Sequence, residues 1–119
     1  MNGALHLRRL GRINVAIDVR VTTRESRFDG LAANIGAGGL FLAADMLSPV
    51  GAEMLLSFRL PELKDELNVR AEVRWVRRDI ASQGDQPLGM GLRFLGLSAG
   101  DKLSLGDFVR GIEDRGHAA

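Results

Sequence analysis

The fold class follows from the stretch Ile13-Asn14-Val15-Ala16-Ile17-Asp18-Val19-Arg20-Val21. Every odd-numbered residue in it is apolar and β-branched, while its even-numbered positions hold polar or small residues. This is the two-residue period of a strand that buries one face and exposes the other. The stretch therefore predicts a strand over 13–21 and a fold in which such strands share one core.

Five later segments show the same alternation, and polar, glycine or proline residues separate them. The weakest covers 28–35, where Leu31, Ala33 and Ile35 are expected to face inward. The other strands are predicted at 40–43, 54–60, 67–75 and 89–95. Six such strands bury their apolar faces by closing into a barrel over 13–95 or by packing as a sandwich. Periodicity alone favours neither architecture.

The apolar period changes near the end of the chain. The helical spacing i, i+3, i+4, i+7 is followed by Leu105, Phe108, Val109 and Ile112. Ser98, three residues before Asp101, is typical of the start of a helix. We predict a helix over 99–114. Two glycines inside it each cost about 1 kcal/mol relative to alanine, so the helix needs to dock on the β-structure to persist.

Composition limits the classes of function. A chain of 119 residues, 45% hydrophobic and 26% charged, has room for one domain, predicted over 1–119. The chain has no cysteine, which excludes disulfides and thiol chemistry and fits the cytoplasm. A net charge of +1 does not indicate binding to a nucleic-acid polymer, and no apolar run is long enough to insert into a membrane.

Catalytic and metal-binding motifs are missing from the sequence. There is no nucleophile–histidine–acid arrangement and no phosphate-binding loop ending in Gly-Lys. His6 and His117 have no neighbours that would complete a metal site. We therefore expect neither an enzyme nor a metal or other cofactor.

Two short motifs are suited to binding an anion. Arg8, Arg9 and Arg12 lie in a basic arm, residues 1–12, that contains no acidic residue. Arginine presents a planar fork that binds phosphate through two hydrogen bonds. Read alone, such a cluster is more typical of a solvated terminus than of a binding site.

The second motif is Asn34-Ile35-Gly36-Ala37-Gly38-Gly39. Its glycines allow positive φ and let backbone N–H groups approach a ligand closely. Asn34 is also a common residue in ordinary turns, where its side chain bonds the local backbone.

In this order the two motifs resemble the PilZ domain family, bacterial receptors for cyclic di-GMP, whose pattern is R-x-x-x-R followed by D/N-x-S-x-x-G. Arg8 and Arg12 match the first part, and Asn34 and Gly39 match the second. Gly36 stands where the family has serine. The resemblance extends over roughly 8–111 through landmarks at Gly38–Leu42, Val73–Val76 and Gly89–Phe94.

The resemblance implies an all-β fold, a six-stranded antiparallel barrel with a C-terminal helix. It also implies a non-catalytic, cytoplasmic receptor that passes the cyclic di-GMP signal to an effector protein. The arm would be flexible without ligand and would fold over the phosphates and guanine edges. The ligand-binding residues would be Arg8, Arg9, Arg12, Asn34, Gly36, Gly38 and Gly39.

Gly36 leaves an alternative open, a PilZ-fold adaptor that has lost ligand binding. The serine hydroxyl of the family pattern would contribute about 0.5–1.5 kcal/mol to binding. Its loss is therefore expected to weaken binding without abolishing it.

Trp75, the one tryptophan, has two interpretations. Its place on the apolar face of 67–75 favours core packing, and the other interpretation puts its ring at the barrel mouth against a base. A barrel that binds single-stranded nucleic acid would need exposed aromatic residues in a basic groove. The absence of tyrosine, and phenylalanines at predicted core positions, argue against that third function.

Overall fold

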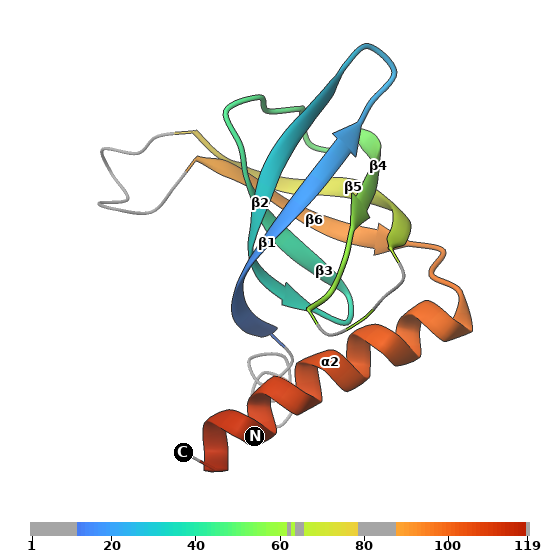
Figure 1. Ribbon diagram of the computed structural model, residues 1–119. Coiled ribbons are helices and arrows are strands. Elements are labelled where there is room, and N and C mark those ends of the chain that lie inside the picture. The colour runs from blue at the N-terminus through green and yellow to red at the C-terminus, as the bar shows by residue number, and fades with distance from the viewer. Residues whose placement is uncertain (1–11, 62, 64–65, 79–87, 119) are drawn as a thin grey trace, which may run out of the picture.

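A closed, six-stranded antiparallel barrel forms the body of the protein (Figure 1). The computed structural model describes residues 12–61, 63, 66–78 and 88–118, with side chains up to residue 111. Around the barrel the strands follow the order β1-β2-β3-β6-β5-β4, and β4 pairs with β1 to close it. The barrel prediction is confirmed. The strands are β1 (Arg12–Thr22), β2 (Arg27–Gly36), β3 (Gly39–Ala43), β4 (Glu53–Phe58), β5 (Leu67–Arg77) and β6 (Gly89–Leu95).

Alternate side chains fill the inside of the barrel. A barrel of eight strands is just wide enough for side chains to fill, so six strands leave less space still. A ligand must therefore bind on the outside. The largest fully buried side chains are Val19, Val21, Ile35, Leu40, Leu42, Leu56, Phe58, Leu60, Val73, Met90 and Leu105.

Three β-bulges interrupt the alternation of the strands. They lie between Asn14 and Ile17 in β1, between Ala32 and Asn34 in β2, and between Val73 and Trp75 in β5. A bulge places one extra residue in one strand, so the side chains beyond it change faces relative to a regular pattern.

The bulge in β2 makes part of the predicted inward face wrong. Ile35 is fully buried as expected, but Leu31 is 39% exposed and Ala32 is buried instead. Ala33, also expected to face inward, is only half-buried. The prediction assumed that every second residue before Ile35 also faces inward. The bulge between Ala32 and Asn34 breaks that alternation.

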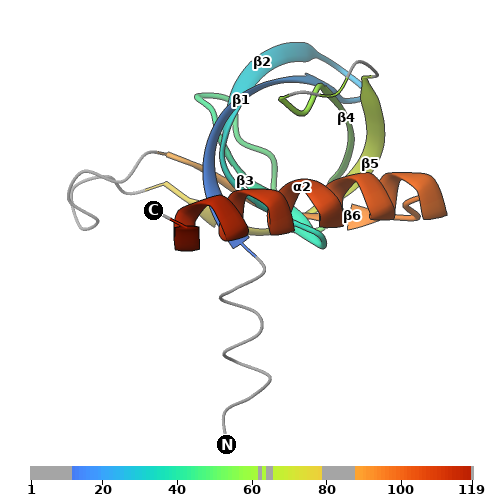
Figure 2. The same ribbon diagram turned by 60° about the horizontal axis from the view of Figure 1, so that its bottom comes forward.

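Helix α2 (Ala99–Ala118) crosses one end of the barrel and contacts β1 and β2 (Figures 1 and 2). It begins where the sequence predicts and ends at Ala118 rather than at residue 114. The Asp101 backbone N–H donates to Ser98 Oγ at 3.0 Å, which caps the first turn. Leu105 and Val109 are buried against the barrel, so the helix docks as predicted. The Ile112 side chain lies outside the described part of the chain.

Candidate functional site

The candidate site is a groove on the outer surface of the barrel. Two adjoining hollows of about 430 Å³ and 530 Å³ share Arg12 and Trp75 in their walls, and together we call them the groove. The first hollow is lined by Arg12, Gly36, Ala37, Gly38, Gly39, Arg74, Trp75, Gly91, Leu92 and Arg93. The second is lined by Arg12, Asn14, Ala33, Asn34, Phe41, Trp75 and Arg77.

The two sequence motifs meet in the groove through Arg12 and Asn34. Arg12 is the first residue of β1 and pairs in register with Gly36, although we expected it in the arm before the strand. Its Nη2 donates a hydrogen bond to Asn34 Oδ1 at 2.9 Å. Asn34 therefore orients an arginine across two strands. Arg8 and Arg9, with the rest of the predicted arm, lie outside the described residues.

The Gly36–Gly39 segment forms the tight connection between β2 and β3, with Ala37 and Gly38 exposed. A Cβ at Gly39 would lie 2.0 Å from the Leu92 carbonyl oxygen of β6, whereas a Cβ at Gly38 would meet open space. Glycine is thus required at position 39 because two backbones approach closely there.

The glycines of this turn do not use the positive φ that glycine allows. The glycines with positive φ in the described part of the chain are Gly51 and Gly96, both outside the motif. The turn is instead fixed by pairing with β6, where the Phe94 N–H donates to the Gly38 carbonyl at 2.9 Å. The segment lines the groove without any left-handed backbone.

Trp75 is 43% exposed and lies on the outer face of the barrel, so the core interpretation is wrong. The bulge after Val73, which is buried, turns the indole outward. The ring stacks on Phe41 with centroids 5.2 Å apart and an interplanar angle of 22°. The Arg77 guanidinium carbon lies 5.1 Å from the Phe41 centroid and 5.3 Å from that of Trp75. The two stacked rings form an aromatic platform of which Trp75 is the exposed part, and Arg77 lies over both rings.

Two glycines of β6 make room for this platform. Gly91 pairs with Phe41 on one side and Trp75 on the other, and its Cβ would lie 2.1 Å from Trp75 Nε1. A Cβ at Gly89 would lie 2.2 Å from the Leu42 carbonyl oxygen and 2.6 Å from Phe41 Cζ. Glycine inside a strand often marks a close approach of another group. The two glycines at alternate positions, Gly89 and Gly91, were the signal in the sequence that could have located the platform.

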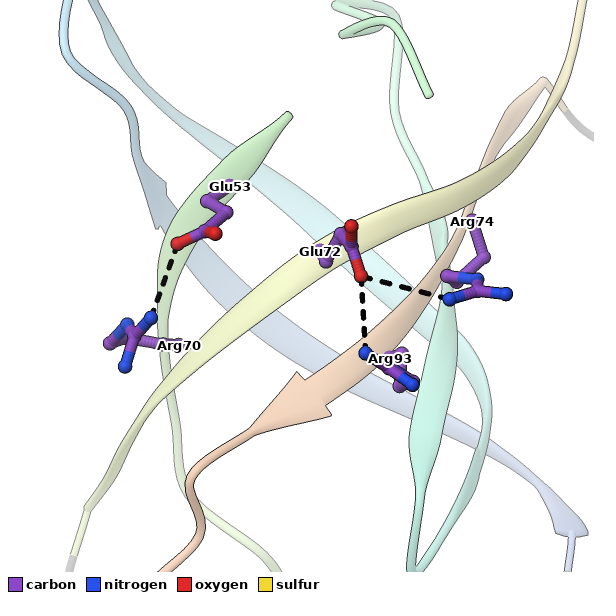
Figure 3. Close-up of polar contacts among 5 residues, drawn as sticks. All are labelled: Glu53, Arg70, Glu72, Arg74 and Arg93. Atoms are coloured by element: carbon purple, nitrogen blue, oxygen red, sulfur yellow. Dashed lines mark hydrogen bonds and ion pairs between the residues drawn. The ribbon is translucent and has the colours of Figure 1, made fainter. Parts of the chain in front are cut away.

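Sequence reasoning also missed three arginines that line the groove, namely Arg74, Arg77 and Arg93. Arg74 and Arg93 share one carboxylate oxygen, Glu72 Oε1, at 3.8 Å and 3.4 Å (Figure 3). Nothing in the linear sequence separates these arginines from others on exposed strand faces.

The chemistry of the groove suits a flat, anionic ligand. Guanidiniums bind phosphate, and an exposed indole stacks on a base. Among the residues described, no group of three or more His, Cys, Asp or Glu side chains could hold a metal ion. In the same part of the chain, α2 is not apolar enough to cross a bilayer.

Several solved structures share this fold. The inhibitor of motility MotI/DgrA of Bacillus subtilis superposes with a TM-score of 0.75 at 28% identity, over 87% of this chain and 49% of that one. The chain thus spans about half the length of MotI/DgrA. The PilZ domain of YcgR from Escherichia coli, solved with c-di-GMP, has a TM-score of 0.67 at 13% identity, over 90% and 92% of the two chains.

The PilZ domain of CeSA from a cellulose-synthesizing bacterium has a TM-score of 0.59 at 17% identity, over 86% of this chain and 97% of that one. A comparison with curated proteins gave no significant match. The sequence pattern described as the PilZ domain matches residues 6–111, nearly the whole chain. This protein therefore belongs to the PilZ domain family.

Proposed function

We propose that this protein is a non-catalytic, cytoplasmic receptor for cyclic di-GMP that passes the signal to a partner protein. The observation that carries the proposal is the hydrogen bond between Arg12 and Asn34. It brings the second arginine of R-x-x-x-R onto the D/N-x-S-x-x-G segment, beside an aromatic platform. The YcgR PilZ domain, which shares the fold, was solved with this ligand.

The ligand would be held by groups of two kinds. Arg12, together with Arg8 and Arg9 of the motif, would bind the phosphates and the guanine O6 and N7 atoms, which match an arginine fork. Trp75 would stack on a guanine, and base–aromatic stacking contributes about 1–3 kcal/mol per base. The backbone of Gly36, Gly38 and Gly39 would allow the ligand to approach the strands closely.

Arg12 is exposed and lines the groove, and its guanidinium has five N–H donors, so the hydrogen bond to Asn34 leaves others for a ligand. The bond to Asn34 fixes the direction of the fork before the ligand arrives. Ordering a side chain in advance lowers the entropy lost on binding. Asn34 thus contributes to affinity even without touching the ligand.

A ligand-independent adaptor is the second candidate, and Gly36 is the observation that favours it. The serine hydroxyl of the family pattern is missing there, while the backbone N–H of residue 36 is kept. On the magnitudes above, the loss lowers affinity by about tenfold at most. We therefore favour a receptor of reduced affinity.

Trp75 provides the test, because it is the one tryptophan and it lines the groove. Titration with cyclic di-GMP is expected to change its fluorescence to saturation in the wild type. Arg8→Ala and Arg12→Ala should lose the change, while Arg70→Ala, an exposed arginine of β5 that pairs with Glu53, should keep it. If folded wild-type protein shows no change and gives no heat on titration, the adaptor is the correct function.

A further inference from the structure

We infer that Arg74 and Arg93 form a second phosphate subsite of the groove, which the Glu72 carboxylate occupies when no ligand is bound. The inference rests on the proposed function for the identity of the ligand. It concerns residues outside both sequence motifs.

Strand register places this subsite opposite the glycine turn. Arg93 of β6 pairs with Gly39 of β3 on one side and with Glu72 of β5 on the other. Arg74 is the extra residue of the bulge between Val73 and Trp75, and it lines the same hollow as the turn. A ligand that fills this hollow between Arg12 and Trp75 would therefore have both guanidiniums within its wall.

The charges around Glu72 do not balance. Its Oε1 receives Arg93 Nη2 at 3.4 Å and Arg74 Nη1 at 3.8 Å, so two cations share one carboxylate oxygen. Each guanidinium has five N–H donors, and both arginine side chains are more than half exposed, at 54% and 56%. Donors thus remain for a phosphate, and the cluster keeps one positive charge in excess.

Both contacts are long for charge-assisted hydrogen bonds, which are normally 2.7–2.9 Å. Both guanidiniums are more than half exposed, so water weakens these ion pairs, although the Glu72 side chain itself is only 27% exposed. A phosphate, which can accept two parallel hydrogen bonds from one arginine, is a better partner than the shared oxygen. The Glu72 carboxylate therefore pairs with the two arginines when no ligand is bound, and the ligand phosphate replaces it.

The neighbouring pair in Figure 3 provides a matched control. Arg70 lies on β5 with Arg74 and pairs with Glu53 of β4 at 3.2 Å. Its side chain is 62% exposed, close to the values for Arg74 and Arg93, whereas Glu53 is more exposed than Glu72. It is a balanced pair of one cation and one anion, and neither residue lines the groove. If surface charge in general controlled ligand affinity, removing Arg70 would lower the affinity as well. If Arg74 and Arg93 form a phosphate subsite, removing Arg70 would leave the affinity unchanged.

Calorimetry with cyclic di-GMP on four variants tests the subsite. Arg93→Ala and Arg74→Ala should each weaken binding by about tenfold, since a hydrogen bond to a charged group contributes roughly one decade of affinity. Glu72→Gln should tighten binding, because it removes the competing anion, and Arg70→Ala should leave it unchanged. A merely structural cluster would instead weaken binding in all three cluster variants, and that result would overturn the inference.

A second measurement separates this inference from the proposed function. Inorganic pyrophosphate is titrated into ¹⁵N-labelled wild-type protein while the arginine Nε–Hε signals are followed. We expect the signals of Arg74 and Arg93 to shift and saturate, and that of Arg70 to stay. If the three signals shift alike or none shifts, the subsite does not exist. If they shift as expected while cyclic di-GMP fails to bind, the proposed ligand is wrong and the subsite stands.

Discussion

Gly91 and Trp75 are register partners on β6 and β5, and the indole of Trp75 occupies the space that a side chain at Gly91 would need. A Cβ at position 91 would lie 2.1 Å from Trp75 Nε1. The indole therefore lies flat across β6 and reaches Phe41 on β3, where the two rings stack. A missing side chain on one strand thus positions an aromatic surface that belongs to the two strands beside it.

Gly91→Ala should displace the indole while leaving the barrel folded, because Trp75 is exposed enough to move. We expect Trp75 emission to shift to the red and the free energy of unfolding to fall by about 0.5–1.5 kcal/mol as the ring pair separates. Fluorescence and urea unfolding measure both. Unchanged emission would mean that the indole does not depend on Gly91.

Gly39→Ala should destabilise the protein by about 1–3 kcal/mol, because its Cβ would overlap the Leu92 carbonyl oxygen of the neighbouring backbone. Gly38→Ala is the matched control, since a Cβ there meets open space, and its effect should stay within about 0.5 kcal/mol. Thermal unfolding followed by circular dichroism distinguishes the two. Equal melting temperatures would contradict the close approach of β3 and β6.

Leu105→Ala should cost about 2–5 kcal/mol, because the side chain is fully buried where α2 docks on the barrel. Leu103, two residues earlier, is 66% exposed, so Leu103→Ala should change stability by less than about 0.5 kcal/mol. Urea unfolding of both variants checks the difference. Similar losses in both would show that the helix docks through another face.

Gly36→Ser should tighten cyclic di-GMP binding by up to about tenfold, since it restores the hydroxyl of the family pattern. Gly36→Ala supplies the control, because it narrows the backbone freedom of the turn without adding a hydrogen-bonding group. Calorimetry of the two variants beside the wild type measures the effect. If the serine and alanine variants bind with equal affinity, any gain over the wild type comes from the stiffer backbone and the serine hydroxyl contributes nothing.

The sequence predicted the strands and the helix because each buries one apolar face with a regular period. All six strands therefore match their predicted ranges within two residues at each end, and α2 starts where Ser98 caps it. The closed barrel needed the family resemblance, because periodicity describes one strand at a time and does not show how the edges pair.

The site was less predictable because it depends on bulges and on contacts between distant strands. Regular alternation along β5 would place Trp75 in the core. The extra residue after Val73 turns the Trp75 side chain to the outer face instead. Asn34 was identified, but its bond to Arg12 joins residues 22 apart and appears only in the fold. Arg74 and Arg93 contact the same Glu72 carboxylate only because β5 and β6 are neighbours.

Calorimetric titration of cyclic di-GMP into wild-type protein, Arg12→Ala and Arg70→Ala tests most directly whether Arg12 binds the ligand. Losing an arginine that pairs with a buried phosphate should cost about 2–5 kcal/mol. We therefore predict saturable binding in the wild type and in Arg70→Ala, and none detectable in Arg12→Ala. Equal affinities in all three folded proteins would contradict a site built around Arg12 and Asn34.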